Sequence, residues 1–214
     1  MQVVFDNWGL ILRAFLETLE LAGLSAVVCL VVGAILAVMR VSPIPPLRWF
    51  GSWYVMIVRN TPLVLVFVLV VHGLSEVGLK GSFFTRAVIA LSVYTAAFVC
   101  EVLRSGMLTV PAGQAEAARA LGMTFGQNLR LVILPQAVRA VLPPMTSVLI
   151  ALVKNTAIAE AFGVAEATSR MDDLIRDHAD AILPIFLAFA AGYMVITLGL
   201  SRIVAWFERR GATT

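Results

Sequence analysis

Hydrophobic residues in this chain form long uninterrupted runs, and charged residues fall between them. The two longest runs without a charge are the 19 residues at 21–39 and the 21 residues at 181–201. A helix rises ~1.5 Å per residue, so each run forms a helix of roughly 30 Å, about the hydrocarbon thickness of a bilayer. Both runs therefore predict membrane-spanning helices.

Three shorter apolar runs complete the pattern, at 60–75, 87–100 and 140–159. We expect the helix of the second of these to continue to Leu103, and the third contains one charge, Lys154. Because lipid offers backbone groups no hydrogen-bond partners, each run must be helical. The pattern predicts an all-α membrane protein with five spans.

The composition supports a membrane protein and excludes two other classes. Hydrophobic residues make up 60% of the 214 residues and charged residues 14%, against roughly 45–50% and 25% in soluble domains. A water-soluble monomer and a disordered chain are both excluded. The 16 Lys and Arg residues form no patch, so the net charge of +3 does not indicate nucleic-acid binding.

The placement of the basic residues predicts the orientation in the membrane. Ten of the 16 fall in the segments 40–59, 104–139 and 202–214, and five fall in the segments on the other side. Cytoplasmic segments carry an excess of Lys and Arg. We therefore expect the N-terminus outside, the C-terminus in the cytoplasm, and 104–139 as a cytoplasmic loop.

That loop has the pattern of two short helices joined by a hinge. Pro111 suits a first helical turn, and strong helix formers follow it at 114–121. Gly122 stands where a helix ends in a left-handed residue. The loop is therefore expected to be compact, as a docking element for a partner requires.

The second helix of the loop carries its own start and stop signals. Thr124 is a candidate N-cap, and Gln127 three residues later completes a capping box. We expect this helix to run to Leu134 and to be interrupted by Pro135 before the fourth span.

The loop resembles the cytoplasmic signature of the permease subunits of binding-protein-dependent ABC importers. The residues of that signature are Glu116, Ala117, Ala118, Gly122, Val132, Ile133, Leu134 and Pro135. Val132 stands in place of the usual Ile. The resemblance extends over roughly residues 18–208, nearly the whole chain.

Further motifs are similar to those of polar amino acid permeases. They are Arg59-Asn60-Thr61-Pro62, with Asn for the usual Gly, Glu101-x-x-Arg104-Ser105-Gly106, Leu134-Pro135-Gln136-Ala137 and Lys154-Asn155-Thr156. Two stretches resemble the permeases of actinobacterial glutamate importers, namely Met39-Arg40-Val41-Ser42-Pro43 and Asp177-His178-Ala179-Asp180.

The resemblance implies a fold, a function and a set of partners. The fold is the five-helix core of type I ABC importer permeases, with 1–214 as one transmembrane domain in the bacterial cytoplasmic membrane. The function is import of a polar amino acid, glutamate first, with a basic amino acid, glutamine or cystine as alternatives. The partners are a similar or identical second permease, two ATPase subunits and an extracytoplasmic substrate-binding protein.

The energy source is expected to lie in the ATPase partners, which hold ATP and Mg. The chain has no G-x-x-x-x-G-K-[ST] loop, so we expect no ATP hydrolysis and no cofactor of its own. No H-E-x-x-H or G-x-S-x-G motif and no metal-ligand spacing indicates an intramembrane enzyme or a metal site. A non-ABC channel or structural subunit remains an alternative, although neither needs the hinged loop.

The resemblance assigns the contact with the ATPase to five loop residues: Glu116, Ala117, Ala118, Gly122 and Phe125. The small alanines would let the helix approach a partner surface closely. The alternative for Glu116 is a solvated helix charge.

Lys154 is the one charged residue expected near mid-bilayer depth, about ten positions after Pro144. An unpaired cation there is costly, so a functional role is the default hypothesis. Lys154 would attract a substrate carboxylate, with Asn155 and Thr156 lending hydrogen bonds. The alternative is structural, with Lys154 paired to Glu160 or to a neighbouring span.

Four further residues are candidates for the substrate pathway or gate. Arg59 is expected near the cytoplasmic boundary, either as an anchor to lipid headgroups or as a gate or subunit contact. Thr61 is expected to cap the second span. Glu101 and Arg104, three apart on one helix face, are expected to pair. The alternative to a pathway role for them is a structural ion pair at the membrane edge.

Overall fold

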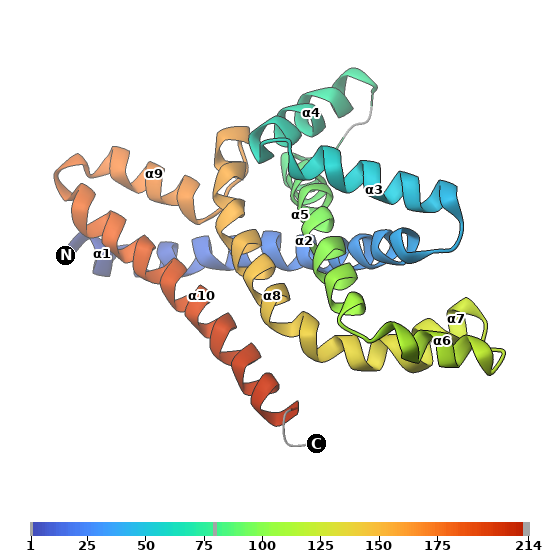
Figure 1. Ribbon diagram of the computed structural model, residues 1–214. Helices are drawn as coiled ribbons and strands as arrows, with labels where there is room; N and C mark the ends of the chain where they lie inside the picture. Colours follow the sequence, from blue (N-terminus) through green and yellow to red (C-terminus); the bar gives the residue numbers. More distant parts are fainter. Residues whose placement is uncertain (1, 79–80, 212–214) are drawn as a thin grey trace. The chain divides into compact units, whose positions relative to one another are not determined.

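The computed structural model describes residues 2–78 and 81–211, and within that part every regular element is a helix (Figure 1). The α-helices are α1 (Gln2–Asp6), α2 (Trp8–Val41), α3 (Pro45–Arg59), α4 (Leu63–Glu76), α5 (Phe83–Leu108), α6 (Ala112–Ala120), α7 (Phe125–Asn128), α8 (Leu134–Asn155), α9 (Ala167–Asp177) and α10 (Ile182–Gly211). One π-helical turn, η1 (Leu129–Ile133), and two 3₁₀ segments, η2 (Thr156–Phe162) and η3 (Ala179–Ala181), lie between them. The predicted all-α class is confirmed.

Among the residues that the structure describes, four helical stretches are long and apolar enough to cross a membrane. They are Trp8–Val41, Phe83–Leu108, Ala140–Phe162 and Ala179–Trp206. The number rises to five when α3 and α4, which follow each other across a short break, count as one bent span. Four of the five predicted runs each coincide with one of these stretches, and the run at 60–75 corresponds to the α4 part of the bent pair.

The second predicted run differs from the structure in its details. Its helix, α4, has 14 residues and at ~1.5 Å per residue is too short to span alone. Thr61 does not cap it, because Pro62 occupies the N-cap position and the Thr61 hydroxyl donates to the Ile57 carbonyl at 2.8 Å. The expected threonine cap is therefore wrong, and Thr61 instead completes the last turn of α3.

The expected interruption at Pro135 is also wrong. The backbone is helical without a break from Phe125 to Asn155, through α7, η1 and α8. In the π-helical turn that precedes Pro135, the Leu134 N–H donates to the Leu129 carbonyl, five residues back. Such a turn changes the hydrogen-bond register, so the missing N–H of Pro135 is accommodated at this point without ending the helix.

The described chain divides into two compact units. The first comprises the chain up to Val28, Pro62–Ser92 and Leu149–Ser201, and the second comprises Cys29–Thr61, Val93–Val148 and the chain from Arg202 onward.

The core of the first unit is built around aromatic contacts between the start of the chain and α10. The Phe15 ring lies 5.7 Å from Phe189 and 5.4 Å, edge to face, from Tyr193. The buried residues Ile11, Leu174 and Ile185 belong to the same cluster. Such rings gain stability from tilted or edge-on contact, so this cluster joins α2, α9 and α10.

A buried carboxylate lies beside that cluster. Glu166 is fully buried and caps α9, where one carboxylate oxygen accepts the Ser169 N–H at 2.9 Å and the other accepts the Tyr193 hydroxyl at 2.9 Å. The sequence patterns did not reveal this cap. The helix N-terminus and the hydroxyl stabilise the buried carboxylate.

The second unit packs its helices through small residues. Gly33 of α2 faces Val99 of α5 so closely that a Cβ at position 33 would overlap the valine side chain. Close approach at small residues is how helices pack in membranes, and here it brings the ends of α2 and α5 together.

Candidate functional site

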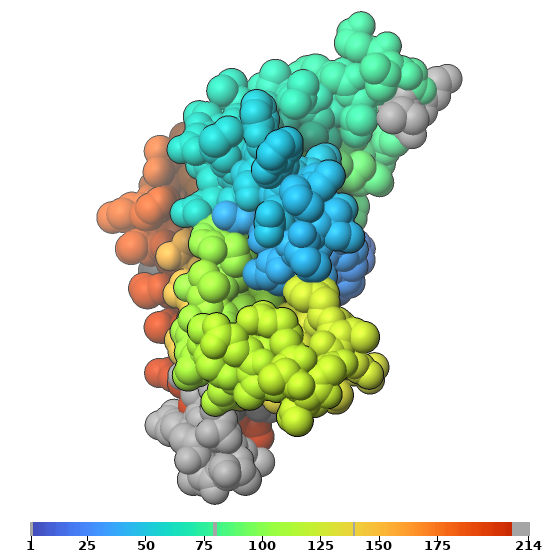
Figure 2. All heavy atoms as spheres, turned by 45° about the vertical axis from the view of Figure 1, so that its right-hand side comes forward, coloured from blue at the N-terminus to red at the C-terminus, as the bar shows by residue number. Residues whose placement is uncertain are grey.

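The loop between α5 and α8 folds as a helical hairpin, as the sequence predicts. Helix α6 ends at Gly122, whose φ of +79° is left-handed. The N–H groups of Gly122 and Met123 donate to the carbonyls of Arg119 and Ala118, at 2.9 and 3.1 Å, and so close the helix. A residue with a Cβ is strained in this conformation. In Figure 2 the hairpin (yellow-green) forms a compact lobe on the surface.

The predicted capping box of α7 is confirmed. The Gln127 N–H donates to the Thr124 hydroxyl at 3.3 Å, and the Thr124 N–H donates to the Gln127 side-chain carbonyl at 2.8 Å. Pro111 occupies the N-cap of α6, one residue before the predicted first turn. The turn chemistry of the hairpin is therefore local and was readable from the sequence.

Asn128 is a hairpin residue that the sequence patterns did not single out. Its side chain is buried, and its amide donates to the Ala115 carbonyl on α6 at 3.1 Å. Asparagine is a poor helix former, and its position in a predicted helix was the only signal. The bond ties the two arms of the hairpin together.

The five predicted coupling residues divide between the surface and the interior of the hairpin. Glu116, Ala117 and Phe125 are exposed, and Gly122 forms the exposed turn. Ala118 is only 4% exposed. The structure therefore presents four of these residues to a partner, and Ala118 packs inside the hairpin.

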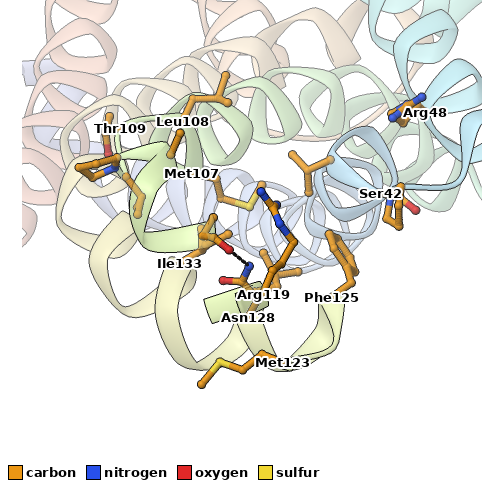
Figure 3. A pocket seen from close by; sticks show the side chains of 17 residues that line it. Ser42, Arg48, Met107, Leu108, Thr109, Arg119, Met123, Phe125, Asn128 and Ile133 are labelled. Atoms are coloured by element: carbon orange, nitrogen blue, oxygen red, sulfur yellow. Dashed lines mark hydrogen bonds between the residues drawn. The ribbon is translucent and has the colours of Figure 1, made fainter. Parts of the chain in front are cut away.

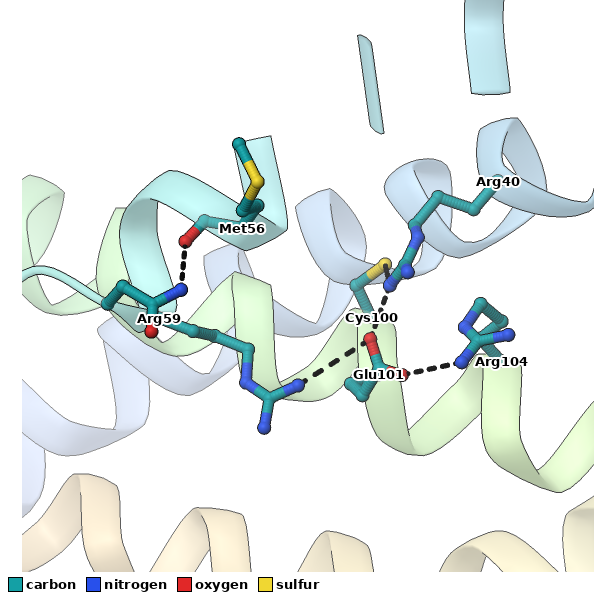
Figure 4. Close-up of polar contacts among 7 residues, drawn as sticks. Arg40, Met56, Arg59, Cys100, Glu101 and Arg104 are labelled. Carbon is teal, nitrogen blue, oxygen red and sulfur yellow. Dashed lines mark hydrogen bonds and ion pairs between the residues drawn. The ribbon is translucent and has the colours of Figure 1, made fainter. Parts of the chain in front are cut away.

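Three arginines of the second unit converge on the carboxylate of Glu101, as Figure 4 shows. Arg104 donates to Glu101 at 2.7 Å, which confirms the predicted pair. Arg40, from the end of α2, donates to the other carboxylate oxygen. Arg59, from the end of α3, lies 3.7 Å from that same oxygen. The cluster has three positive charges and one negative charge.

An open cavity of about 460 Å³ adjoins this cluster. Its lining residues are Arg40, Ser52, Val55, Met56, Arg59, Asn60, Phe98 and Glu101. The Arg59 guanidinium lies 5.5 Å from the centre of the Phe98 ring, a cation–π contact that orients it. Because the positive charges outnumber the negative one, the cavity suits an anion.

Lys154 lies in the first unit and is exposed at the end of α8. The alternative in which Lys154 pairs with Glu160 is not found, because no ion pair joins Lys154 to any residue that the structure describes. Thr156 is fully buried and its hydroxyl donates to the Val153 carbonyl at 2.7 Å. Its hydroxyl proton is therefore already used, whereas Lys154 is free to attract an anion.

One ion pair of the first unit joins α9, which lies outside the candidate spans, to α2. Arg170 of α9 lies 3.3 Å from Glu17. The hydrogen bond and the charge of that carboxylate raise the pKa of the Arg170 guanidinium above its usual value.

Comparison with known proteins decides the family. A sequence model of the binding-protein-dependent transport system inner membrane component matches residues 29–212. The chain belongs to this family of ABC importer permeases. The permease shares 44% identity over 200 residues, 88% of either chain, with the glutamate transport system permease protein GluC of Corynebacterium efficiens. The corresponding protein of Corynebacterium glutamicum is equally similar.

Solved structures agree with this assignment. The permease superimposes on a crystal structure of an amino acid ABC transporter with histidines at a TM-score of 0.87 and 34% identity, covering 97% of this chain and 96% of that one. It superimposes on an inward-facing MetNI methionine ABC transporter at 0.72 and 26% identity, covering 94% and 97%. The predicted family and type of fold are confirmed, and in this family a separate ATPase hydrolyses ATP.

The structure thus brings together only some of the predicted pathway residues. Arg104 and Arg59 meet at Glu101 beside the cavity, and Arg40 joins them although the sequence patterns did not mark it as a pathway residue. The only feature of the sequence that could have singled out Arg40 is its position at the end of a predicted span, where its long side chain can reach a neighbouring helix. Lys154 belongs to the other unit.

Proposed function

We propose that this permease is the membrane-spanning subunit of an ATP-driven importer that moves glutamate into the cytoplasm by alternating access. Two relatives at 44% identity are named as glutamate permeases. A further relative, the glutamate/aspartate import permease protein GltK of Escherichia coli, shares 34% identity over 211 residues, 94% of this chain and 93% of its own.

The excess of positive charge around Glu101 is the observation that supports an acidic substrate. Arg40, Arg59 and Arg104 present three guanidinium groups to one carboxylate, and Arg59 is 43% exposed beside the cavity. Guanidinium groups bind carboxylates through paired, charge-assisted hydrogen bonds. A second carboxylate, from the substrate, would therefore find unused donors on Arg59.

The chain has 214 residues and no P-loop, so the proposal places ATP and Mg on two partner ATPase subunits. The exposed Glu116, Ala117, Gly122 and Phe125 of the hairpin are proposed to dock on an ATPase. Ala118 is proposed to act indirectly, because its burial maintains the shape of the hairpin.

The remaining parts of the assembly follow from the family. A second permease, similar or identical, would complete the pathway, and an extracytoplasmic binding protein would deliver the substrate. The chain is proposed to act as one transmembrane domain in the cytoplasmic membrane, with 104–139 and the C-terminus inside and the N-terminus outside, as the basic residues indicate.

Reconstitution tests this function. The permease would be co-purified with its ATPase and second permease, placed in liposomes, and supplied with the binding protein and ATP. We expect uptake of labelled glutamate that requires ATP and is not competed by glutamine, arginine or cystine. Preferred uptake of one of those three amino acids would overturn the substrate, and uptake without ATP would indicate a channel.

A further inference from the structure

A second cavity, of about 660 Å³, lies against the hairpin, and the proposed transport cycle assigns it no ligand. Its wall includes the loop at Val41–Pro43, Arg48 of α3 and the end of α5 at Met107 and Leu108. The hairpin supplies the remaining side, with Arg119 among the side chains drawn in Figure 3. All of these residues belong to the second unit.

The walls of this cavity combine apolar surface with unneutralised positive charge. Met107, Phe125 and Ile133 are apolar, whereas Arg48 and Arg119 are exposed guanidinium groups. Neither arginine forms an ion pair with any residue in the described part of the chain. Both guanidinium groups are therefore available to bind an anion.

Helix α3 indicates where that anion comes from. Next to Arg48 it exposes Trp49, Phe50 and Trp53, which are 71%, 61% and 64% accessible. Tryptophan concentrates at the level of lipid headgroups. Arginine beside tryptophan at the start of α3 is therefore typical of a helix end at the level of the headgroups.

We propose that this cavity binds an anionic phospholipid of the cytoplasmic leaflet. Its phosphate is held by Arg48 and Arg119, and its acyl chains lie along the apolar wall and the aromatic face of α3. The inner leaflet carries anionic lipids, and basic pockets at span ends bind their headgroups. Since Arg119 lies on α6, a bound lipid joins the hairpin to α3 and so makes its position depend on the membrane.

The inference uses the orientation given in the proposed function, but neither the substrate nor the coupling role. Native mass spectrometry of the detergent-purified importer complex, incubated with phosphatidylglycerol, measures the bound lipid directly. We expect Arg48→Gln and Arg119→Gln each to lower retained phosphatidylglycerol about fivefold, since each removes one charge. Arg48→Lys should retain it.

Arg130→Gln is the matched control, because Arg130 is exposed on η1 and does not line the cavity. Equal retention by the two cavity variants and by Arg130→Gln would overturn the inference. Displacement of the lipid by millimolar inorganic phosphate would overturn the lipid as the ligand and assign the site to a free phosphate. Because binding is measured without transport, failure of glutamate uptake leaves this result interpretable.

Discussion

At the scale of single residues, the attraction of a substrate carboxylate depends on which basic side chains are already paired with a carboxylate of the protein. Glu101 accepts from Arg104 and Arg40, whereas Arg59 lies 3.7 Å away and remains 43% exposed. Lys154 has no ion-pair partner among the described residues. Among the predicted pathway residues, we therefore propose Arg59 and Lys154 as the two cations that attract a substrate carboxylate.

Replacing Arg59 tests the first of these. We expect Arg59→Gln to raise the KM for glutamate uptake roughly tenfold, because a hydrogen bond to a charged group contributes about 1.5 kcal/mol. Arg59→Lys should recover part of the affinity, since it keeps the charge but loses the planar fork. An unchanged KM for Arg59→Gln in proteoliposomes would remove Arg59 from the substrate pathway.

Replacing Lys154 tests the second. Lys154→Met keeps the length of the side chain and removes its charge, so we expect slower glutamate uptake with a raised KM. Lys154→Arg, which preserves the charge, serves as the control. Uptake kinetics by Lys154→Met that match the unmodified importer would exclude Lys154 from the site and leave the Glu101 cluster as the anion-binding region.

At the scale of elements, the hairpin of α6 and α7 is a rigid unit. Gly122 closes α6 in a left-handed conformation, Thr124 and Gln127 start α7, and Asn128 binds across to Ala115. The π-helical turn η1 then leads directly into α8. We therefore propose that movement of the hairpin is transmitted to α8, which continues into a candidate span.

Gly122 is the position at which we expect a substitution to disturb the hairpin most. Gly122→Pro cannot adopt φ of +79°, so we expect ATP hydrolysis to continue with glutamate uptake reduced at least tenfold. Capture of glutamate by the binding protein should be unaffected. The control is Gly113→Ala in α6, where an added Cβ meets no atom within 4 Å. The measurement is the ratio of glutamate transported to ATP hydrolysed, and an unchanged ratio for Gly122→Pro would argue against coupling through this hairpin.

At the scale of the whole molecule, the prediction concerns the orientation of the chain in the membrane. The native cysteines, Cys29 and Cys100, are buried, so a single added cysteine reports its own exposure. We expect Leu121→Cys, at a site 80% exposed on the hairpin, to react with a membrane-impermeant maleimide only after the cells are opened. Asp177→Cys, on α9, should react in intact cells. The opposite pattern of labelling would reverse the topology.

The sequence by itself determined the membrane class, the approximate spans and the chemistry of the hairpin turn. These follow from hydrophobic run length and from capping between residues three or four apart, which are local properties. The left-handed Gly122 and the Thr124–Gln127 capping box were predictable for that reason. The motifs Arg59–Pro62 and Glu101–Gly106 likewise pointed to the family that the comparisons showed.

Only the tertiary structure decided which charges meet. Arg40 lies 61 positions from Glu101 along the chain, and no sequence period relates them. The burial of Ala118 and Glu166, the Asn128 bond across the hairpin and the missing Lys154–Glu160 pair depend likewise on how helices pack. The interruption expected at Pro135 was wrong because a π-helical turn precedes the proline and accommodates the lost N–H.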